Sequence, residues 1–213
     1  FSFGRPLIAK TRRWGWVVIL TGGYNNVGGS QPGQGALFIL NAKTGELLGP
    51  SAGATPAYTT GPGTAASPSG FAQIEGYTPS YQDYTLDYVY GGDLNGDLWR
   101  FDFSNILDDL PPVTKIAEFN TSGVGQAITT APKIEYSADD LKRYVFVGTG
   151  RLLSAEDQEN SQKQSMYAVR DGTKTRAFGS ESYQVSLPSG SSFPVKRSNL
   201  VEVTDLIAGA KLD

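Results

Sequence analysis

Short apolar runs alternate with glycine- and turn-rich segments along the chain, a pattern typical of strands joined by tight turns. The stretch Tyr88–Asp102 shows it most clearly. An aromatic and β-branched run reaches Gly91-Gly92, turns at Asn95-Gly96 and returns as Leu98–Phe101. Asn-Gly suits a tight hairpin turn because both residues tolerate positive φ. The stretch therefore predicts a β-hairpin.

Two other segments repeat the same order of an apolar strand, a Gly-Gly or Gly-Thr-Gly sequence, an insert and a second strand. One joins Trp16–Gly23 to Ala36–Gly45, and the other joins Arg143–Gly150 to Ser165–Gly172, with a helical turn expected within 151–164. The strand cores are 71 and 56 residues apart. A propeller blade occupies about 40–50 residues, so the repeats fit blades with long insertions.

Each pair supplies the two inner strands of a four-stranded blade, and near-continuous apolar runs favour strands buried on both faces. Glycine at the strand ends lets backbones approach closely or bulge. Residues 49–70, rich in Gly, Ala, Ser, Thr and Pro, predict a long surface loop. Candidates for the remaining strands are Pro6–Ala9, Glu46–Leu48, Val113–Ala117, Pro132–Tyr136, Tyr183–Leu187 and Asn199–Val203.

The predicted fold is therefore all-β: residues 1–213 form a single partial β-propeller of about three to four blades. So few blades do not close a ring, since propellers have four to eight. The chain begins without an initiator Met or a signal peptide. We therefore expect it to be a piece of a longer protein.

Composition narrows the possible functions. Only 18% of residues are charged and the net charge is -3, so no basic footprint for nucleic acid is present. No apolar run approaches the roughly 20 residues of a membrane span. The chain has no Cys and no His, which excludes disulfides, thiolate metal sites, a Ser-His-Asp triad and a His-ligated metal.

Several acidic clusters are candidates for chemistry. Asp93–Asp97 resembles the start of a calcium loop, but strand residues follow it at once, so a hairpin turn is expected. Asp83 and Asp87 could flank a cation with the Thr85 carbonyl between them; the alternative is a solvated loop with an Asx turn. The pairs Asp108-Asp109 and Asp139-Asp140 are interpreted as solvated turns.

The strand Trp99–Asp102 places Trp99 and Phe101 on one face and Arg100 and Asp102 on the other. We expect a buried aromatic pair, with Arg100 and Asp102 pairing at the surface or between blades. The alternative is an aromatic platform for stacking sugars.

An ordered set of segments carries a family resemblance. The set is Trp16–Asn26, Ala36–Gly45, Ser67–Phe71, Tyr88–Asp102, Gln126–Pro132, Phe146–Leu153 and Gln164–Asp171. Together they resemble the C-terminal region of the type IV pilus tip-adhesin and biogenesis-factor family, PilC/PilY. The resemblance implies a quinoprotein-like β-propeller in an exported protein at the cell surface or pilus tip, or associated with the outer membrane.

The resemblance also implies partners and a metal. The propeller of such proteins docks on minor pilins and promotes pilus assembly, and a separate N-terminal domain adheres to host or abiotic surfaces. Some members hold calcium in a nine-residue loop that corresponds to 79–87 here. Asp83 and Asp87 match its fifth and ninth positions and Thr85 its carbonyl position. Pro79 and Tyr81, at the first and third, cannot supply carboxylates.

The leading hypothesis is a non-enzymatic module for pilus assembly and adhesion that needs no cofactor. A quinoprotein-type dehydrogenase is the alternative that Leu37–Gly45 raises, because such enzymes share this turn. A glycan-binding propeller is the third hypothesis.

Overall fold

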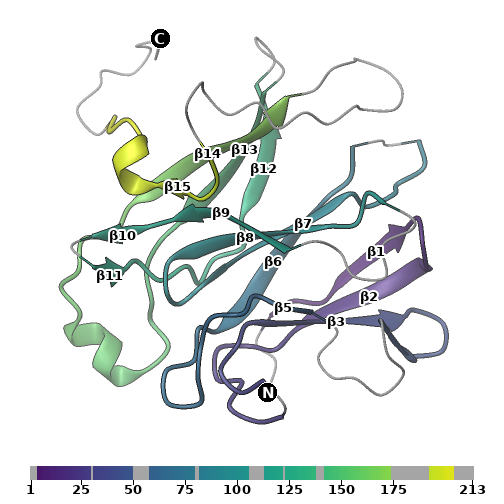
Figure 1. Ribbon diagram of the computed structural model, residues 1–213, viewed down its shortest axis with the longest axis horizontal. Coiled ribbons are helices and arrows are strands. Elements are labelled where there is room, and N and C mark those ends of the chain that lie inside the picture. The colour runs from purple at the N-terminus through teal and green to yellow at the C-terminus, as the bar shows by residue number, and fades with distance from the viewer. Residues whose placement is uncertain are drawn as a thin grey trace.

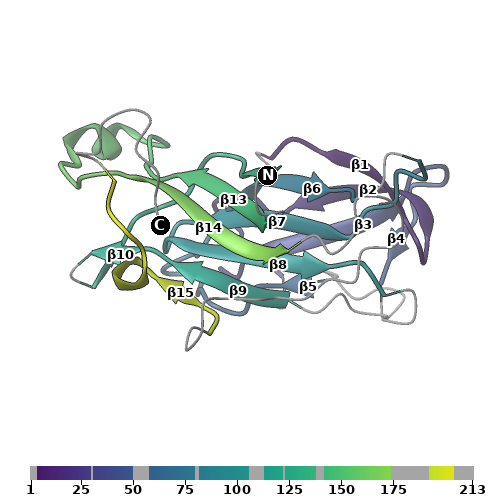
Figure 2. The same ribbon diagram turned by 90° about the horizontal axis from the view of Figure 1, so that it is seen from above.

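Three β-sheets pack one behind another in chain order, as blades of a propeller do (Figures 1 and 2). The computed structural model describes residues 4–29, 31–49, 58–79, 82–105, 113–121, 123–137, 142–173 and 192–203. Strands β1–β3 lie at one end, β12–β14 lie at the other, and β6–β9 lie between them. The prediction of an all-β partial propeller is confirmed.

The first blade contains β1 (Leu7–Thr11), β2 (Gly15–Thr21), β3 (Ala36–Asn41) and β4 (Leu47–Leu48) in that order, with β5 (Tyr58–Thr59) also paired to β3. Residues 58 and 59 were expected in a loop; they are a short strand because their backbone pairs with the start of β3. Residues 50–57 of the expected loop lie outside the described residues.

The central blade contains β6 (Phe71–Tyr77), β7 (Tyr88–Asp93), β8 (Asp97–Asp102) and β9 (Val113–Glu118). A short strand, β15 (Val195–Lys196), pairs parallel to β9 and completes the sheet. The hairpin β7–β8 is the one predicted. Its loop is Leu94-Asn95-Gly96, and only Gly96 takes a positive φ, of 82°. The loop is thus one residue longer than a tight two-residue turn, with the glycine in the left-handed position.

The third blade contains β12 (Lys133–Tyr136), β13 (Lys142–Gly148) and β14 (Met166–Thr173). A ribbon of β10 (Asn120–Thr121) and β11 (Val124–Gly125) precedes it. The predicted helical turn is the 3₁₀ helix η1 (Ala155–Glu159). The candidate strand at 199–203 is wrong: Asn199 ends a second 3₁₀ helix, η2 (Arg197–Asn199), and 200–203 are irregular. Candidate 183–187 lies outside the described residues.

Two hydrophobic cores hold the blades together. One lies between the first and central blades and includes Ile19, Ile39, Phe71, Trp99 and Phe101. The other lies between the central and third blades. Its members include Tyr90, Leu98, Ile116, Val145 and Val169. The central sheet therefore buries apolar side chains on both faces, which is the stabilising arrangement for a propeller blade.

Burial on both faces, which the apolar runs predicted, holds for β7 and β8 but not for β2 or β13. These two strands alternate between buried and half-buried positions because each outer blade packs against one described sheet. Ile8 and Trp16 on the outward face of the first blade are 68% and 56% exposed.

Gly91 and Gly92 show why the hairpin needs glycine at its strand end. A Cβ on Gly91 would lie 2.4 Å from the Phe71 ring, and one on Gly92 would lie 2.2 Å from Ile128. Each glycine therefore lets one of the two cores close against the sheet. A close approach of backbones was expected at these glycines; the groups that lie against them are side chains instead.

Candidate functional site

The turn of the central hairpin is organised by the buried carboxylate of Asp93. Its Oδ1 accepts hydrogen bonds from the backbone N–H of Asn95 at 2.9 Å and of Asp97 at 3.0 Å. Its Oδ2 accepts from Trp99 Nε1 at 2.9 Å. Asp93–Asp97 is therefore a hairpin turn, as the sequence predicts, and its first carboxylate is committed to the turn.

Burial raises the pKa of Asp93 to about 7, and the nearby Asp97 carboxylate acts in the same direction. The hydrogen bonds from Trp99, Asp97 and Asn95 favour the ionised form and limit the rise. Asp93 thus titrates near neutral pH while it fixes the position of the turn.

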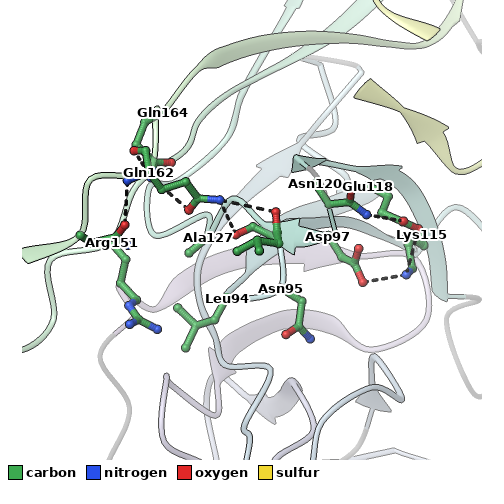
Figure 3. A pocket seen from close by; sticks show the side chains of 14 residues that line it. Leu94, Asn95, Asp97, Lys115, Glu118, Asn120, Ala127, Arg151, Gln162 and Gln164 are labelled. Atoms are coloured by element: carbon green, nitrogen blue, oxygen red, sulfur yellow. Dashed lines mark hydrogen bonds and ion pairs between the residues drawn. The ribbon is translucent and has the colours of Figure 1, made fainter. Parts of the chain in front are cut away.

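A polar groove lies beside this turn (Figure 3). It has a volume of about 520 Å³, which falls within the range of about 300–1,000 Å³ for ligand sites. Its walls come from the β7–β8 turn, the end of β9, the ribbon β10–β11 and the loop around η1. Five carboxamides line it: Asn95, Asn120, Asn160, Gln162 and Gln164.

The polar groove is lined by two cations, Lys115 and Arg151, and by two carboxylates, Asp97 and Glu118. Lys115 Nζ lies 2.7 Å from Asp97 Oδ2 and 3.8 Å from Glu118 Oε2. Burial pulls the pKa of Lys115 down, but the hydrogen bond and charge of Asp97 outweigh it, so that pKa is raised. Arg151 Nε lies 2.6 Å from Asp157 Oδ1. These pairs leave a groove that can hydrogen-bond a ligand without selecting a charged one.

Asp83, Thr85 and Asp87 lie in the loop before β7, and cationic side chains contact both aspartates. Arg12, from the β1–β2 turn, forms an ion pair with Asp87. Lys10 Nζ donates to the backbone oxygen of Asp83 at 3.3 Å. The Asp83 carboxylate accepts from the Thr85 N–H at 3.0 Å, an Asx turn whose backbone hydrogen bond lowers the pKa of Asp83.

This arrangement does not fit calcium, which takes six to eight oxygen ligands. Arg12 already neutralises Asp87, and Lys10 lies on the carbonyl oxygen of Asp83. Within the described ranges, no three His, Cys, Asp or Glu side chains are grouped so that they could hold a metal. Tyr81 and the pairs Asp108-Asp109 and Asp139-Asp140 lie outside the described residues.

The strand Trp99–Asp102 has the alternation that the sequence predicts. Trp99 is 6% exposed and Phe101 is fully buried, so the aromatic pair is a core element and not a platform for sugars. Arg100 pairs with Asp171 of the third blade, at 2.5 Å between Nη1 and Oδ1. The pair expected between blades exists, but Asp171 takes the place of Asp102.

Sequence reasoning missed the polar groove because its residues come from four separate segments. The polar composition of 151–164 was the available signal, since it contributes Arg151, Asn160, Gln162 and Gln164. Nothing in the local sequence links that loop to Lys115 and Asn120. No helix in the described part of the chain has the length and apolar character needed to cross a membrane.

Comparison with known proteins gives a consistent result. A sequence model described as the PilY1 beta-propeller domain matches residues 1–186. A type IV pilus biogenesis factor PilY1 homolog of Xylella fastidiosa is 31% identical over 170 residues, 80% of this chain and 12% of that protein. The PilY1 of Pseudomonas aeruginosa is 27% identical over 205 residues, which cover 84% of this chain and 16% of that protein.

A solved structure agrees with the sequence matches. The crystal structure of the Pseudomonas aeruginosa PilY1 C-terminal domain superimposes with a TM-score of 0.59 at 26% identity. The match covers 80% of this chain and 37% of that one. The chain therefore spans a small part of its curated relatives and about a third of the solved domain. Because the family model matches residues 1–186 and the described residues form propeller blades, the chain belongs to the PilY1 beta-propeller domain family.

Proposed function

We propose that this propeller is a non-enzymatic part of a type IV pilus biogenesis factor, exported to the cell surface and located at the pilus tip. The observation that carries the proposal is the family match over residues 1–186. Its relatives are named type IV pilus biogenesis factors. In this role the propeller docks on minor pilins and supports pilus assembly, while surface adhesion resides in a separate N-terminal domain.

The chemistry of the described residues supports a binding role. The sequence contains no His and no Cys, and its buried carboxylates are engaged in hydrogen bonds or ion pairs. Asp93 holds a turn, Asp97 pairs with Lys115, and Asp171 pairs with Arg100. These carboxylates therefore hold a turn and join the blades, and this structural role supports a binding function over a catalytic one.

We propose further that the propeller works without calcium in the 82–87 loop. Arg12 and Lys10 supply positive charge where the carboxylate of Asp87 and the carbonyl of Asp83 would otherwise face a metal. Because these cations are side chains of the protein itself, they are present at any calcium concentration, and the loop would not respond to calcium.

Deletion of this propeller from the full-length gene tests the proposal. We expect loss of surface pili and of pilus-dependent adhesion, and we expect the purified chain to retain minor pilins in a pull-down. Normal piliation and adhesion after the deletion would contradict it. A quinone absorbance band in the purified protein would instead support the dehydrogenase.

A further inference from the structure

We propose that the polar groove binds an extended, uncharged polypeptide segment of a partner protein. This inference rests on the docking function proposed above and assigns it a place. The groove is the cavity lined by the β7–β8 turn, the end of β9, the ribbon β10–β11 and the loop around η1 (Figure 3).

The hydrogen-bonding groups of the groove match a peptide main chain. Each of its five carboxamides carries an NH2 donor group and a carbonyl acceptor, the same pair of functions that a peptide unit presents. Asn120, Gln162 and Gln164 each use an NH2 hydrogen within the protein and have a second one for a ligand. Figure 3 shows Asn95 and Asn120 on one side of the groove and Gln162 and Gln164 on the other. A strand-like segment between them could donate and accept on both of its edges.

The charge balance of the groove selects a neutral ligand. Asp97 and Glu118 lie around Lys115, and Arg151 is held by Asp157. An acidic or basic segment would have to compete with these ion pairs, whereas an uncharged one leaves them intact.

Apolar features of the lining favour a peptide over a sugar. The lining includes three apolar residues, Leu94, Val124 and Ala127. Val124 is 61% exposed. The lining has no aromatic ring on which a sugar could stack, because Trp99 lies beneath the Lys115 ammonium. In the described part of the chain β10 and β11 pair as strands only with each other, and Gln162 Nε2 donates to the carbonyl oxygens of Val124 and Gly125 in β11. The carboxamides of the groove, and not this strand edge, would therefore hold the peptide.

The groove is largely preformed, which lowers the entropic cost of binding. A Cβ on Gly125 would lie 1.9 Å from the Asn95 carbonyl oxygen, so the ribbon and the hairpin turn are in tight contact. Gln162 Nε2 donates to the Gly125 carbonyl oxygen at 3.2 Å and ties the η1 loop to the ribbon. The Asp93 carboxylate holds the backbone N–H groups of Asn95 and Asp97 in place by hydrogen bonds.

The test uses the full chain, immobilised soluble domains of minor pilins from the same organism, and uncharged decapeptides tiled across them. We expect the wild type to bind a pilin domain and at least one tile from it. The double variant Asn95→Ala/Asn120→Ala should weaken both by about ten-fold, which is about 1.4 kcal/mol, because it removes two carboxamides that bond the peptide. Val124→Asp, on the exposed rim, should weaken them as well. Gln82→Ala, an exposed carboxamide outside the lining, is the matched control.

The outcomes separate this inference from the proposed function. If pilin domains bind and the groove variants bind them equally well, docking stands and the groove inference is wrong. Absence of binding to every pilin domain and tile also overturns it, as does capture of a neutral oligosaccharide that the double variant abolishes. The proposed function itself fails on normal piliation after deletion of the propeller. Equal melting temperatures for the variants would show that they fold.

Discussion

Arg143 and Asp171, both of the third blade, meet where that blade packs against the central blade. Arg143 Nε donates to the Asp171 backbone oxygen at 3.0 Å, and its Nη2 lies 3.6 Å from the Asp171 carboxylate. The guanidinium also lies 4.5 Å from the Tyr77 ring centroid and 4.6 Å from that of Tyr88. Both charged residues are fully buried. A cation enclosed by rings and a carboxylate therefore joins two blades.

Replacing Arg143 should destabilise the propeller strongly. Arg143→Met removes the hydrogen bond to the Asp171 backbone oxygen and the contacts of the cation with two tyrosine rings, while Asp171 keeps its pair with Arg100, so we expect the free energy of unfolding to fall by about 1–3 kcal/mol. Lys133→Met is the matched control, because Lys133 pairs with Glu75 at 3.5 Å across the same blades with a side chain that is 73% exposed. It should cost at most about 1 kcal/mol. Urea denaturation measures both, and similar losses would contradict the buried-pair explanation.

The fold was predictable where the pattern is local. The Asn95-Gly96 turn and its flanking runs specify the hairpin, because turn chemistry and strand propensity act over a few residues. Strand β6 was missed since Phe71–Tyr77 mixes polar, glycine and apolar residues and follows a loop-like sequence. Pairing with β7 makes it a strand, and pairing is a tertiary effect.

The candidate sites were harder to predict because their contacts are distant in sequence. Arg12 and Asp87 are 75 residues apart, so the cation that answers Asp87 could not be identified from the loop itself. The same holds for Arg100 and Asp171, which are 71 residues apart. The sequence shows where the carboxylates lie along the chain. Which cation neutralises each of them depends on how the blades pack.

Stability should depend on pH through Asp93. Its folded pKa, about 7, is raised above the unfolded value of about 3.8, so the folded state binds more protons between these two values. The stabilisation is fully present below about pH 4 and is lost as the pH rises through 7. The loss is at most about 4 kcal/mol, at about 1.4 kcal/mol per pH unit. Melting temperature against pH measures it, and Asp93→Ala should flatten this part of the profile. A wild-type profile with no fall from pH 4 to 7 would contradict it.

Calcium should leave the 82–87 loop unchanged. We expect the same melting temperature in calcium and in EGTA, and no micromolar heat of binding in calorimetry. Arg12→Ala should lower the free energy of unfolding by at most about 1 kcal/mol because the pair with Asp87 is partly exposed. Arg13→Ala, at the neighbouring position, is the control. Micromolar calcium binding that Asp87→Ala abolishes would overturn the expectation.

Gly125 should be irreplaceable in the wall of the polar groove. A Cβ there would lie 1.9 Å from the Asn95 backbone oxygen and 2.5 Å from its carbonyl carbon, and a backbone cannot move away as a flexible side chain would. Gly125→Ala should therefore lower the free energy of unfolding by about 1–3 kcal/mol, as overpacking does. Gly28→Ala is the matched control, since a Cβ on Gly28 meets nothing within 4 Å. It should stay within about 0.5 kcal/mol of the wild type. Urea denaturation compares the two, and equal stability would show that the ribbon and the hairpin turn are not in the tight contact that shapes the groove.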